Sequence, residues 1–240
     1  MEQRKLLVLG GTGNTGRWVV KMAIERGHRV RALVRSKAGL EECDGLELVE
    51  GDVLDPVVVQ RVMNGCDAVI SCLGIRRETP SDPRSPLISP EDFTARSAKY
   101  TVDAMKACGV ERLVGISSAG VGDSWSTLDP GLRSVIETSN VGVAFRDLDN
   151  MEKVYRDSGL DTLAVRPVAL VGGSATGSAG IVDRFEPSSK ISTGDVAQWM
   201  LDAVERPAPF ARRTEMIGWA LPSGADRAAE DSPPRHRVSR

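Results

Sequence analysis

Short apolar runs that end at glycine or at polar residues recur along most of the chain. Residues 6–9, Leu-Leu-Val-Leu, contain no polar position and end at Gly10, which is typical of a strand buried on both faces. Similar runs predict further strands at residues 30–34, 46–49, 68–70, 113–116 and 163–165. Because these runs do not alternate with polar residues, they indicate a parallel sheet covered on both faces.

Stretches suited to helices separate these strands. The predicted helices span residues 15–26, 56–63, 92–108, 143–157 and 194–205. Gly27 and Gly109 follow two of them and can adopt the left-handed conformation that ends a helix. Strands that alternate with helices form right-handed βαβ units. The sequence therefore predicts a single α/β domain over residues 1–220, a Rossmann-type doubly wound parallel sheet.

Three loops rich in glycine or proline follow predicted strands. The first runs from Gly74 to Pro90 and holds four prolines, which exclude a regular helix or central strand. The others lie at residues 120–124 and 172–174. We expect all three loops at the carboxyl edge of the sheet, where open α/β folds bind ligands. From Pro222 onward the chain has no aromatic residue, and we expect residues 221–240 to form a disordered tail.

Composition excludes several classes of function. The 31 basic and 33 acidic side chains nearly cancel, so nucleic acid is not expected as a partner. The four cysteines form no Cys-x-x-Cys pair, which indicates neither a metal site nor a disulfide framework and fits reduced thiols in the cytosol. No segment resembles a signal peptide or a membrane span, so we expect a cytoplasmic protein that does not bind membranes.

Residues 10–16, Gly-Gly-Thr-Gly-Asn-Thr-Gly, lie between the first strand and the first helix. Glycines at Gly10, Gly13 and Gly16 allow the backbone to approach a pyrophosphate, and the helix N-terminus supplies free N–H groups and a partial positive charge. The strand before the motif and the helix and second strand after it distinguish it from a simple tight turn. The motif predicts dinucleotide binding.

The end of the second strand indicates which dinucleotide is bound. NAD-specific sites usually place a carboxylate about 20 residues beyond the glycine loop. Here residues 35–37 are Arg-Ser-Lys, and a guanidinium can bind a 2′-phosphate through two parallel hydrogen bonds. Arg35 therefore favours NADP(H), unless Arg35 and Lys37 are ordinary solvated charges at a strand end.

The next two strand ends carry further candidate contacts. Asp52 either accepts a hydrogen bond from the adenine amino group, with Val53 against the ring, or caps the following turn. Residues 71–74, Ser-Cys-Leu-Gly, are small enough to let the cofactor ribose pass close to Cys72. We interpret Cys72 as a packing residue and not a nucleophile, because no histidine lies near it in the sequence.

Several motifs in order resemble the atypical short-chain dehydrogenase/reductases, in particular the biliverdin-IXβ reductase/flavin reductase branch and its NmrA-like relatives. Besides the glycine motif and Arg35, they are Gly-Asp-Val at 51–53, Ile-Ser-Ser-Ala at 116–119, Ser-Gly-Leu-Asp at 158–161 and Arg-Pro at 166–167. The resemblance covers residues 4 to about 218. It implies that the phosphates are held by Thr12, Gly13, Asn14 and Thr15. It also implies that Arg35 contacts the 2′-phosphate and that Asp52 and Val53 contact the adenine. The nicotinamide half of the cofactor would be lined by Leu73, Gly74, Ser117, Ser118 and Pro167.

The Tyr-x-x-x-Lys pair of typical short-chain dehydrogenases is absent, because Tyr100 is followed four residues later by Ala104 and Tyr155 by Gly159. The biliverdin/flavin reductase branch also lacks this pair and positions its acceptor mainly by shape. Ser118 matches the serine that lies near the acceptor there, and it is our candidate catalytic residue. Alternatively, Ser118 only satisfies backbone groups at a strand end.

These features favour an NADPH-dependent reductase whose small-molecule substrate is a planar acceptor such as a flavin, a quinone or a biliverdin-like tetrapyrrole. Such acceptors take a hydride while the proton comes from water. A non-catalytic NADP(H)-sensing regulator of the NmrA-like kind stays open, as does an epimerase or isomerase with a bound cofactor. A monomer or a small homo-oligomer is expected.

Overall fold

A computed structural model describes residues 2–37, 39–40 and 43–219 of the chain. The predicted tail at residues 221–240 lies outside these residues, so its disorder stays a prediction. Among the described helices, none combines the length and the hydropathy needed to cross a membrane.

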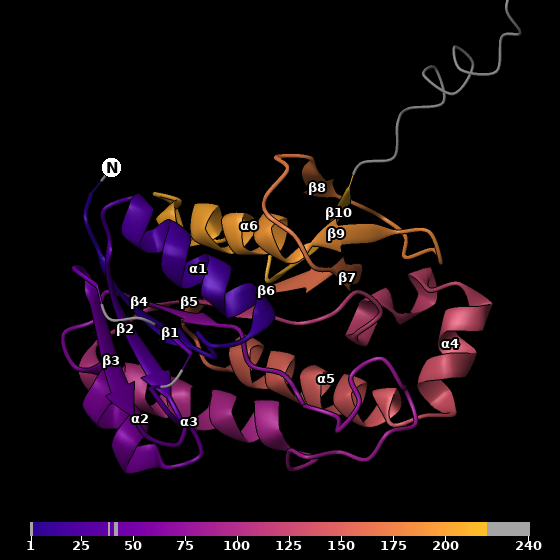
Figure 1. Ribbon diagram of the computed structural model, residues 1–240, viewed down its shortest axis with the longest axis horizontal. Helices are drawn as coiled ribbons and strands as arrows, with labels where there is room; N and C mark the ends of the chain where they lie inside the picture. The colour runs from indigo at the N-terminus through magenta and orange to yellow at the C-terminus, as the bar shows by residue number, and fades with distance from the viewer. Residues whose placement is uncertain (1, 38, 41–42, 220–240) are drawn as a thin grey trace, which may run out of the picture.

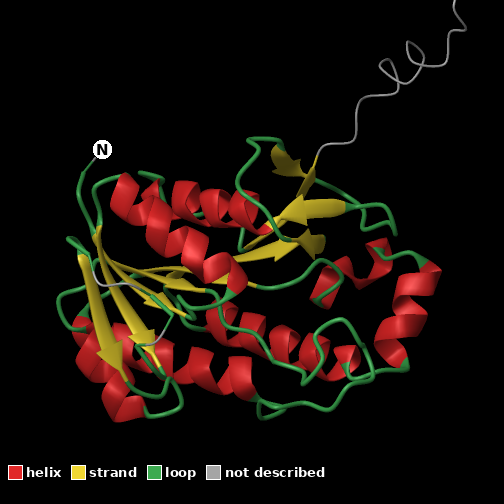
Figure 2. Cartoon of the chain, viewed as in Figure 1, coloured by secondary structure: helices red, strands yellow, loops and turns green. Residues whose placement is uncertain are grey.

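Eight strands form the central sheet in the order β3-β2-β1-β4-β5-β6-β10-β8 (Figure 2). Their bounds are β1 Lys5–Leu9, β2 Arg29–Val34, β3 Leu46–Glu50, β4 Ala68–Ser71, β5 Arg112–Ile116, β6 Asp161–Pro167, β8 Ala179–Ile181 and β10 Thr214–Trp219. All neighbours are parallel except β10 and β8. The first six strands follow the order of a doubly wound dinucleotide-binding sheet, which confirms the predicted fold class.

Helices cover both faces of this sheet (Figure 1). On one face lie α1 (Asn14–Glu25) and α6 (Thr193–Glu205). On the other lie α2 (Pro56–Met63), α3 (Phe93–Cys108) and α5 (Val141–Asp157). The six predicted strands and five predicted helices are all present, with ends within two residues of their predicted positions.

The central strands are apolar throughout because their side chains enter two cores. Leu6 and Val8 pack on the α1 and α6 side, whereas Leu7 and Leu9 pack on the side of α2, α3 and α5. All four are essentially inaccessible to solvent. Successive residues of a strand point to opposite faces, so a run without polar positions is what a sheet between two helical layers requires.

Besides β8 and β10, four short described elements were not expected from the apolar pattern. The segment predicted as a loop at residues 120–124 runs into a 3₁₀ helix, η1 (Gly122–Thr127), which is closed by the Ser124 hydroxyl. Beyond it lies α4 (Pro130–Glu137), capped by the Asp129 carboxylate. Strands β7 (Ala169–Val171) and β9 (Lys190–Ser192) form a separate parallel pair. The loop prediction at 120–124 was therefore wrong in part, because hydrogen bonds to Ser124 wind it into a helical turn.

Candidate cofactor and acceptor site

The glycine motif makes a tight turn between β1 and α1. Gly10 has a φ of +76°, and a Cβ there would lie 2.8 Å from the Cys72 carbonyl oxygen at the end of β4. A Cβ on Gly16 would overlap the Gly10 carbonyl oxygen. The Gly13 N–H donates to that same oxygen at 3.0 Å and closes the turn. Only glycine fits Gly10 and Gly16, because backbone occupies the space that a side chain would need.

The first turn of α1 has the free donors that a pyrophosphate requires. Its N-cap, Gly13, provides no side-chain acceptor, and the turn contains no acidic residue. Thr12, Gly13 and Asn14 are exposed, whereas Thr15 is buried. Helix N-terminal N–H groups without side-chain acceptors bind anions well, so the geometry of this turn fits a dinucleotide phosphate.

Arg17 lies in the same first turn, and sequence reasoning did not single it out. Its Nε donates to the Thr12 carbonyl at 2.9 Å, and its guanidinium extends close to Gly39 in the loop after β2. A cation in the first turn opposes the helix dipole, which disfavours it unless an anion binds nearby. Its position directly after Gly16 was the signal in the sequence that pointed to it.

A cavity of about 490 Å³ lies at the ends of β2 and β3, lined by Arg35, Glu50, Gly51 and Asp52. Arg35 is exposed and forms no ion pair with Glu50 or Asp52 in the described part of the chain. The Asp52 carboxylate accepts the Leu54 N–H at 2.9 Å, which is the turn-capping alternative. Val53 is buried in the core, so its contact with adenine stays a prediction.

The end of β4 lies directly against the glycine turn. The Leu73 side chain is close to Gly10, and Gly74 is exposed with open space around it. Burial raises the pKa of the Cys72 thiol to about 12, so the thiol is protonated at neutral pH. This protonated state agrees with a packing role for Cys72 and disfavours a nucleophilic one.

Ser117 belongs to a buried polar network. Its hydroxyl donates to Glu152 Oε1 of α5 at 2.5 Å. Arg166 of β6 donates to both oxygens of Glu152, at 2.9 and 2.5 Å, and also to Asp123 of η1. Burial acts to lower the pKa of Arg166, but the two carboxylates outweigh it and raise the pKa. The Ser117 proton is thus held by Glu152, and its predicted contact with the cofactor stays untested.

Ser118 is less constrained than its neighbour. It is half-buried, and its hydroxyl donates only to the adjacent Ala119 carbonyl, at 3.2 Å. The Ala119 N–H in turn donates to the carbonyl of the buried Pro167, which joins the ends of β5 and β6. The structure therefore brings Ser118 and Pro167 together at the carboxyl edge of the sheet.

Tyr155 lies in the core between α5 and the sheet. Only 3% of its surface is exposed, and its ring occupies the space above Gly115. Burial raises the pKa of the phenol, and a hydrogen bond with Ser71 only partly opposes this. The Tyr155 hydroxyl is therefore a core group, protonated at physiological pH.

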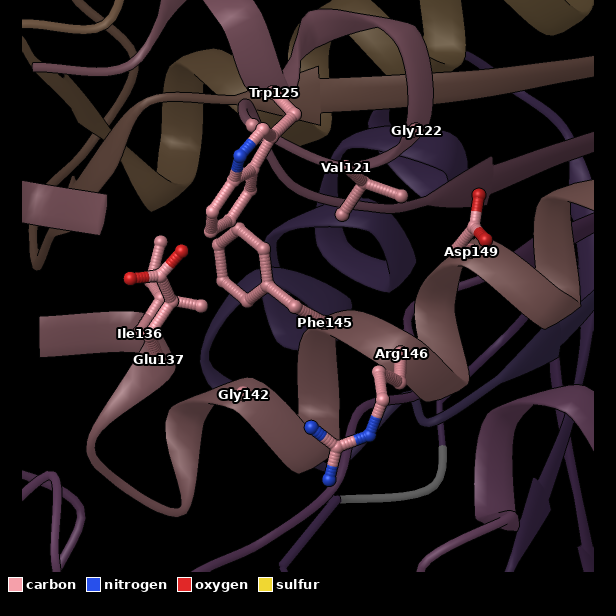
Figure 3. A pocket seen from close by; sticks show the side chains of 10 residues that line it. Val121, Gly122, Trp125, Ile136, Glu137, Gly142, Phe145, Arg146 and Asp149 are labelled. Carbon is pink, nitrogen blue, oxygen red and sulfur yellow. The ribbon is translucent and has the colours of Figure 1, made fainter. Parts of the chain in front are cut away.

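A second cavity, of about 280 Å³, opens between η1, α4 and α5 (Figure 3). Its wall begins at Gly120, two residues beyond Ser118. In Figure 3 the rings of Trp125 and Phe145 point toward one another, and Arg146 extends from α5 on another side. Residues 120–122 of this wall lie in the loop that was predicted at the ligand-binding edge, whereas Trp125, Phe145 and Arg146 were not predicted, because η1, α4 and α5 meet only in the folded chain.

Comparison with known proteins identifies the cofactor class. A family model described as NAD(P)H-binding matches residues 10–207. The chain belongs to the NAD(P)H-binding family. The match begins at Gly10 of the glycine motif and confirms the predicted nicotinamide dinucleotide cofactor.

Two curated proteins with similar sequences match about half of the chain. The photosystem II assembly factor Ycf39 of Trieres chinensis is 36% identical over 118 residues, which are 48% of this chain and 35% of that protein. Cinnamoyl-CoA reductase 2 of Arabidopsis thaliana is 29% identical over 129 residues, 50% of this chain and 37% of its own length. The chain thus spans about a third of these relatives.

Solved structures match the whole fold. ChuY, an anaerobillin reductase from Escherichia coli O157:H7, superposes with a TM-score of 0.72 at 22% identity, covering 89% of this chain and 96% of ChuY. A short-chain dehydrogenase/reductase from Veillonella parvula in complex with NADP gives a TM-score of 0.72 at 13% identity, covering 92% and 96%. The resemblance to atypical short-chain dehydrogenase/reductases is confirmed by the NAD(P)H-binding family and by this fold.

Proposed function

We propose that this protein is an NADPH-dependent reductase that acts on a planar acceptor such as a flavin, a quinone or a biliverdin-like tetrapyrrole. One observation carries the proposal. The glycine turn and the cavity beside Trp125 and Phe145 both lie at the carboxyl edge of the sheet, and Ser118 lies on the segment that leads into the cavity. A cofactor bound at the glycine turn and an acceptor bound in the cavity would meet near Ser118.

Different residues of this chain bind the cofactor and orient the acceptor. The free N–H groups of α1 bind the pyrophosphate, and Arg35, with Arg17 nearby, favours a 2′-phosphate. When bound, NADPH supplies the hydride. Ser118 orients the carboxamide or the acceptor through its hydroxyl. A conjugated planar acceptor delocalises the added charge, so water can supply the proton and no tyrosine acid is needed.

The cofactor preference provides the first prediction. NADPH is expected to bind at least tenfold more tightly than NADH, a difference of about 1.4 kcal/mol. Arg35→Ala should remove most of this preference and leave NADH affinity nearly unchanged, because Arg35 contacts only the extra phosphate. Calorimetric titration with both cofactors measures the effect. Arg29→Ala is the matched control, since Arg29 is exposed at the opposite end of the same strand. Equal affinities of the unaltered protein for the two cofactors would refute the assignment.

The proton source provides the second prediction. Tyr155→Phe is expected to leave turnover close to that of the unaltered protein, because the Tyr155 hydroxyl is buried in the core and supplies no proton to an acceptor. Ser118→Ala should lower turnover by more than it changes NADPH affinity. Steady-state rates and cofactor titrations of both variants test this. If Tyr155→Phe abolished turnover and Ser118→Ala did not affect it, tyrosine would be the acid.

The proposal as a whole is tested by following NADPH oxidation against a panel of flavins, quinones and biliverdins. Turnover of one of them is the expected result. A non-catalytic NADP(H)-binding role is the second candidate. It is favoured by the sequence similarity to Ycf39, which is an assembly factor. Tight NADPH binding without oxidation by any acceptor in the panel would support that role and contradict the reductase.

A further inference from the structure

Arg146 on the wall of the cavity in Figure 3 is a cation that has no partner among the described residues. It is exposed in the second turn of α5, and it forms no hydrogen bond or ion pair within the described ranges of the chain. Asp149, one turn further along the same wall, is already paired with Lys153 at 2.7 Å. The charge of Arg146 is therefore available to a ligand.

The backbone beside Arg146 also favours an anion. Helix α5 has 17 residues, and its first turn contains no acidic residue. Ser139 accepts the Val141 and Gly142 N–H groups, so the helix contributes through its dipole and not through free N–H groups at these two positions. The positive end of the helix dipole thus lies on the same side of the cavity as the guanidinium. Glu137, at the end of α4, lies on a different side of the Trp125 and Phe145 rings in Figure 3. A ligand with a second anionic group would meet repulsion there.

The remaining wall limits the size and shape of the ligand. Val121, Trp125, Ile136 and Phe145 present apolar and aromatic surface. The volume of about 280 Å³ lies just below the range of roughly 300–1,000 Å³ that is typical of sites for drug-sized ligands. Aromatic side chains favour flat rings, which they contact in offset stacks or edge to face. The space therefore suits one or two fused rings better than a linear tetrapyrrole.

We propose that this cavity binds a one- or two-ring aromatic molecule with a single anionic group, which pairs with Arg146. The inference deepens the proposed function and rests on it for the role of the ligand: the acceptor would be a quinone of this size that carries one acidic group. Hydride from NADPH and a proton from water then convert the quinone into its hydroquinone and leave NADP⁺.

Binding alone tests the pocket. The full chain saturated with NADP⁺ is titrated in a calorimeter with 2-naphthoate and with the uncharged 2-naphthamide. We expect 2-naphthoate to bind at least tenfold more tightly. Arg146→Ala should reduce 2-naphthoate affinity about tenfold without changing 2-naphthamide affinity, whereas Arg146→Lys should keep most of the difference. Arg156→Ala is the matched control on the same helix, since Arg156 is exposed and lines no part of the cavity.

The outcomes separate this inference from the reductase proposal. Equal affinity for the two ligands, no binding of either, or an equal loss of both in Arg146→Ala would overturn the inference even if NADPH oxidation by some acceptor is observed. Selective binding of 2-naphthoate that depends on Arg146 would uphold it even if no acceptor in the panel is reduced, in which case the reductase proposal alone fails.

Discussion

Replacing Glu152 by alanine is expected to lower the free energy of unfolding by about 3 kcal/mol, because the buried Arg166 would lose its buried counter-charge and keep the largely exposed Asp123 as its partner. The side chains of Glu152 and Arg166 are each only 6% exposed, and Arg166 donates two hydrogen bonds to the carboxylate. Ser117 would lose its acceptor as well. Denaturant unfolding followed by circular dichroism measures the change.

The adjacent residue supplies the control for this experiment. Lys153 is half-exposed on the same helix and pairs with Asp149 at the surface. Lys153→Ala should therefore cost no more than about 1 kcal/mol. Glu152→Gln retains the shape of the side chain and should be less damaging than alanine, which keeps the comparison possible if the alanine variant does not fold. A Glu152→Ala variant as stable as Lys153→Ala would contradict the buried pair.

Gly16→Ala is expected to weaken NADPH binding at least a hundredfold, or by about 2.7 kcal/mol. A Cβ at this position would overlap the Gly10 carbonyl oxygen, so the turn or the start of α1 must move. That movement misplaces the N–H groups that face the pyrophosphate, and such overpacking also costs about 1–3 kcal/mol of stability. NADPH titration of the folded variant, with unfolding measured in parallel, gives both effects.

Gly180→Ala is the corresponding control. Gly180 lies on the edge strand β8, where an added Cβ would meet nothing within 4 Å. This variant should bind NADPH as the unaltered protein does and lose little stability. Normal NADPH affinity in Gly16→Ala would show that the cofactor does not use this turn.

The elements that could be predicted are those whose burial is visible in the local sequence. The strand at residues 5–9 is apolar at nearly every position, and the helix that follows it begins at a glycine motif. Strand β10 was not predicted, because only Ile217 and Gly218 of its six residues are buried and it therefore shows no apolar run. Helix α4 has few buried residues, and its start was overlooked although Asp129 and Pro130 form an ordinary helix start.

The candidate site likewise has parts that the local sequence predicts and parts that it does not. The glycine turn is encoded in consecutive residues between a predicted strand and a predicted helix, so its role followed from its spacing together with this local context. The partnership of Glu152 with Arg166 joins a helix to a strand, and a glutamate on a helix gives no local sign that it is buried. The aromatic cavity depends on how α4 and η1 fold against α5, which apolar periodicity does not specify. Contacts between elements were therefore the part that sequence patterns could not supply.

The place of β10 in the sheet bears on how the protein folds as it is synthesised. This strand is the last of the described strands along the chain, yet it lies between β6 and β8, with Ile217 fully buried opposite Pro167. Strands β1 to β6 can assemble earlier, but until β10 emerges from the ribosome the unpaired backbone groups of β6 form an open edge, which is prone to pairing with other chains. We therefore expect nascent chains that stop before residue 214 to aggregate or to require a chaperone.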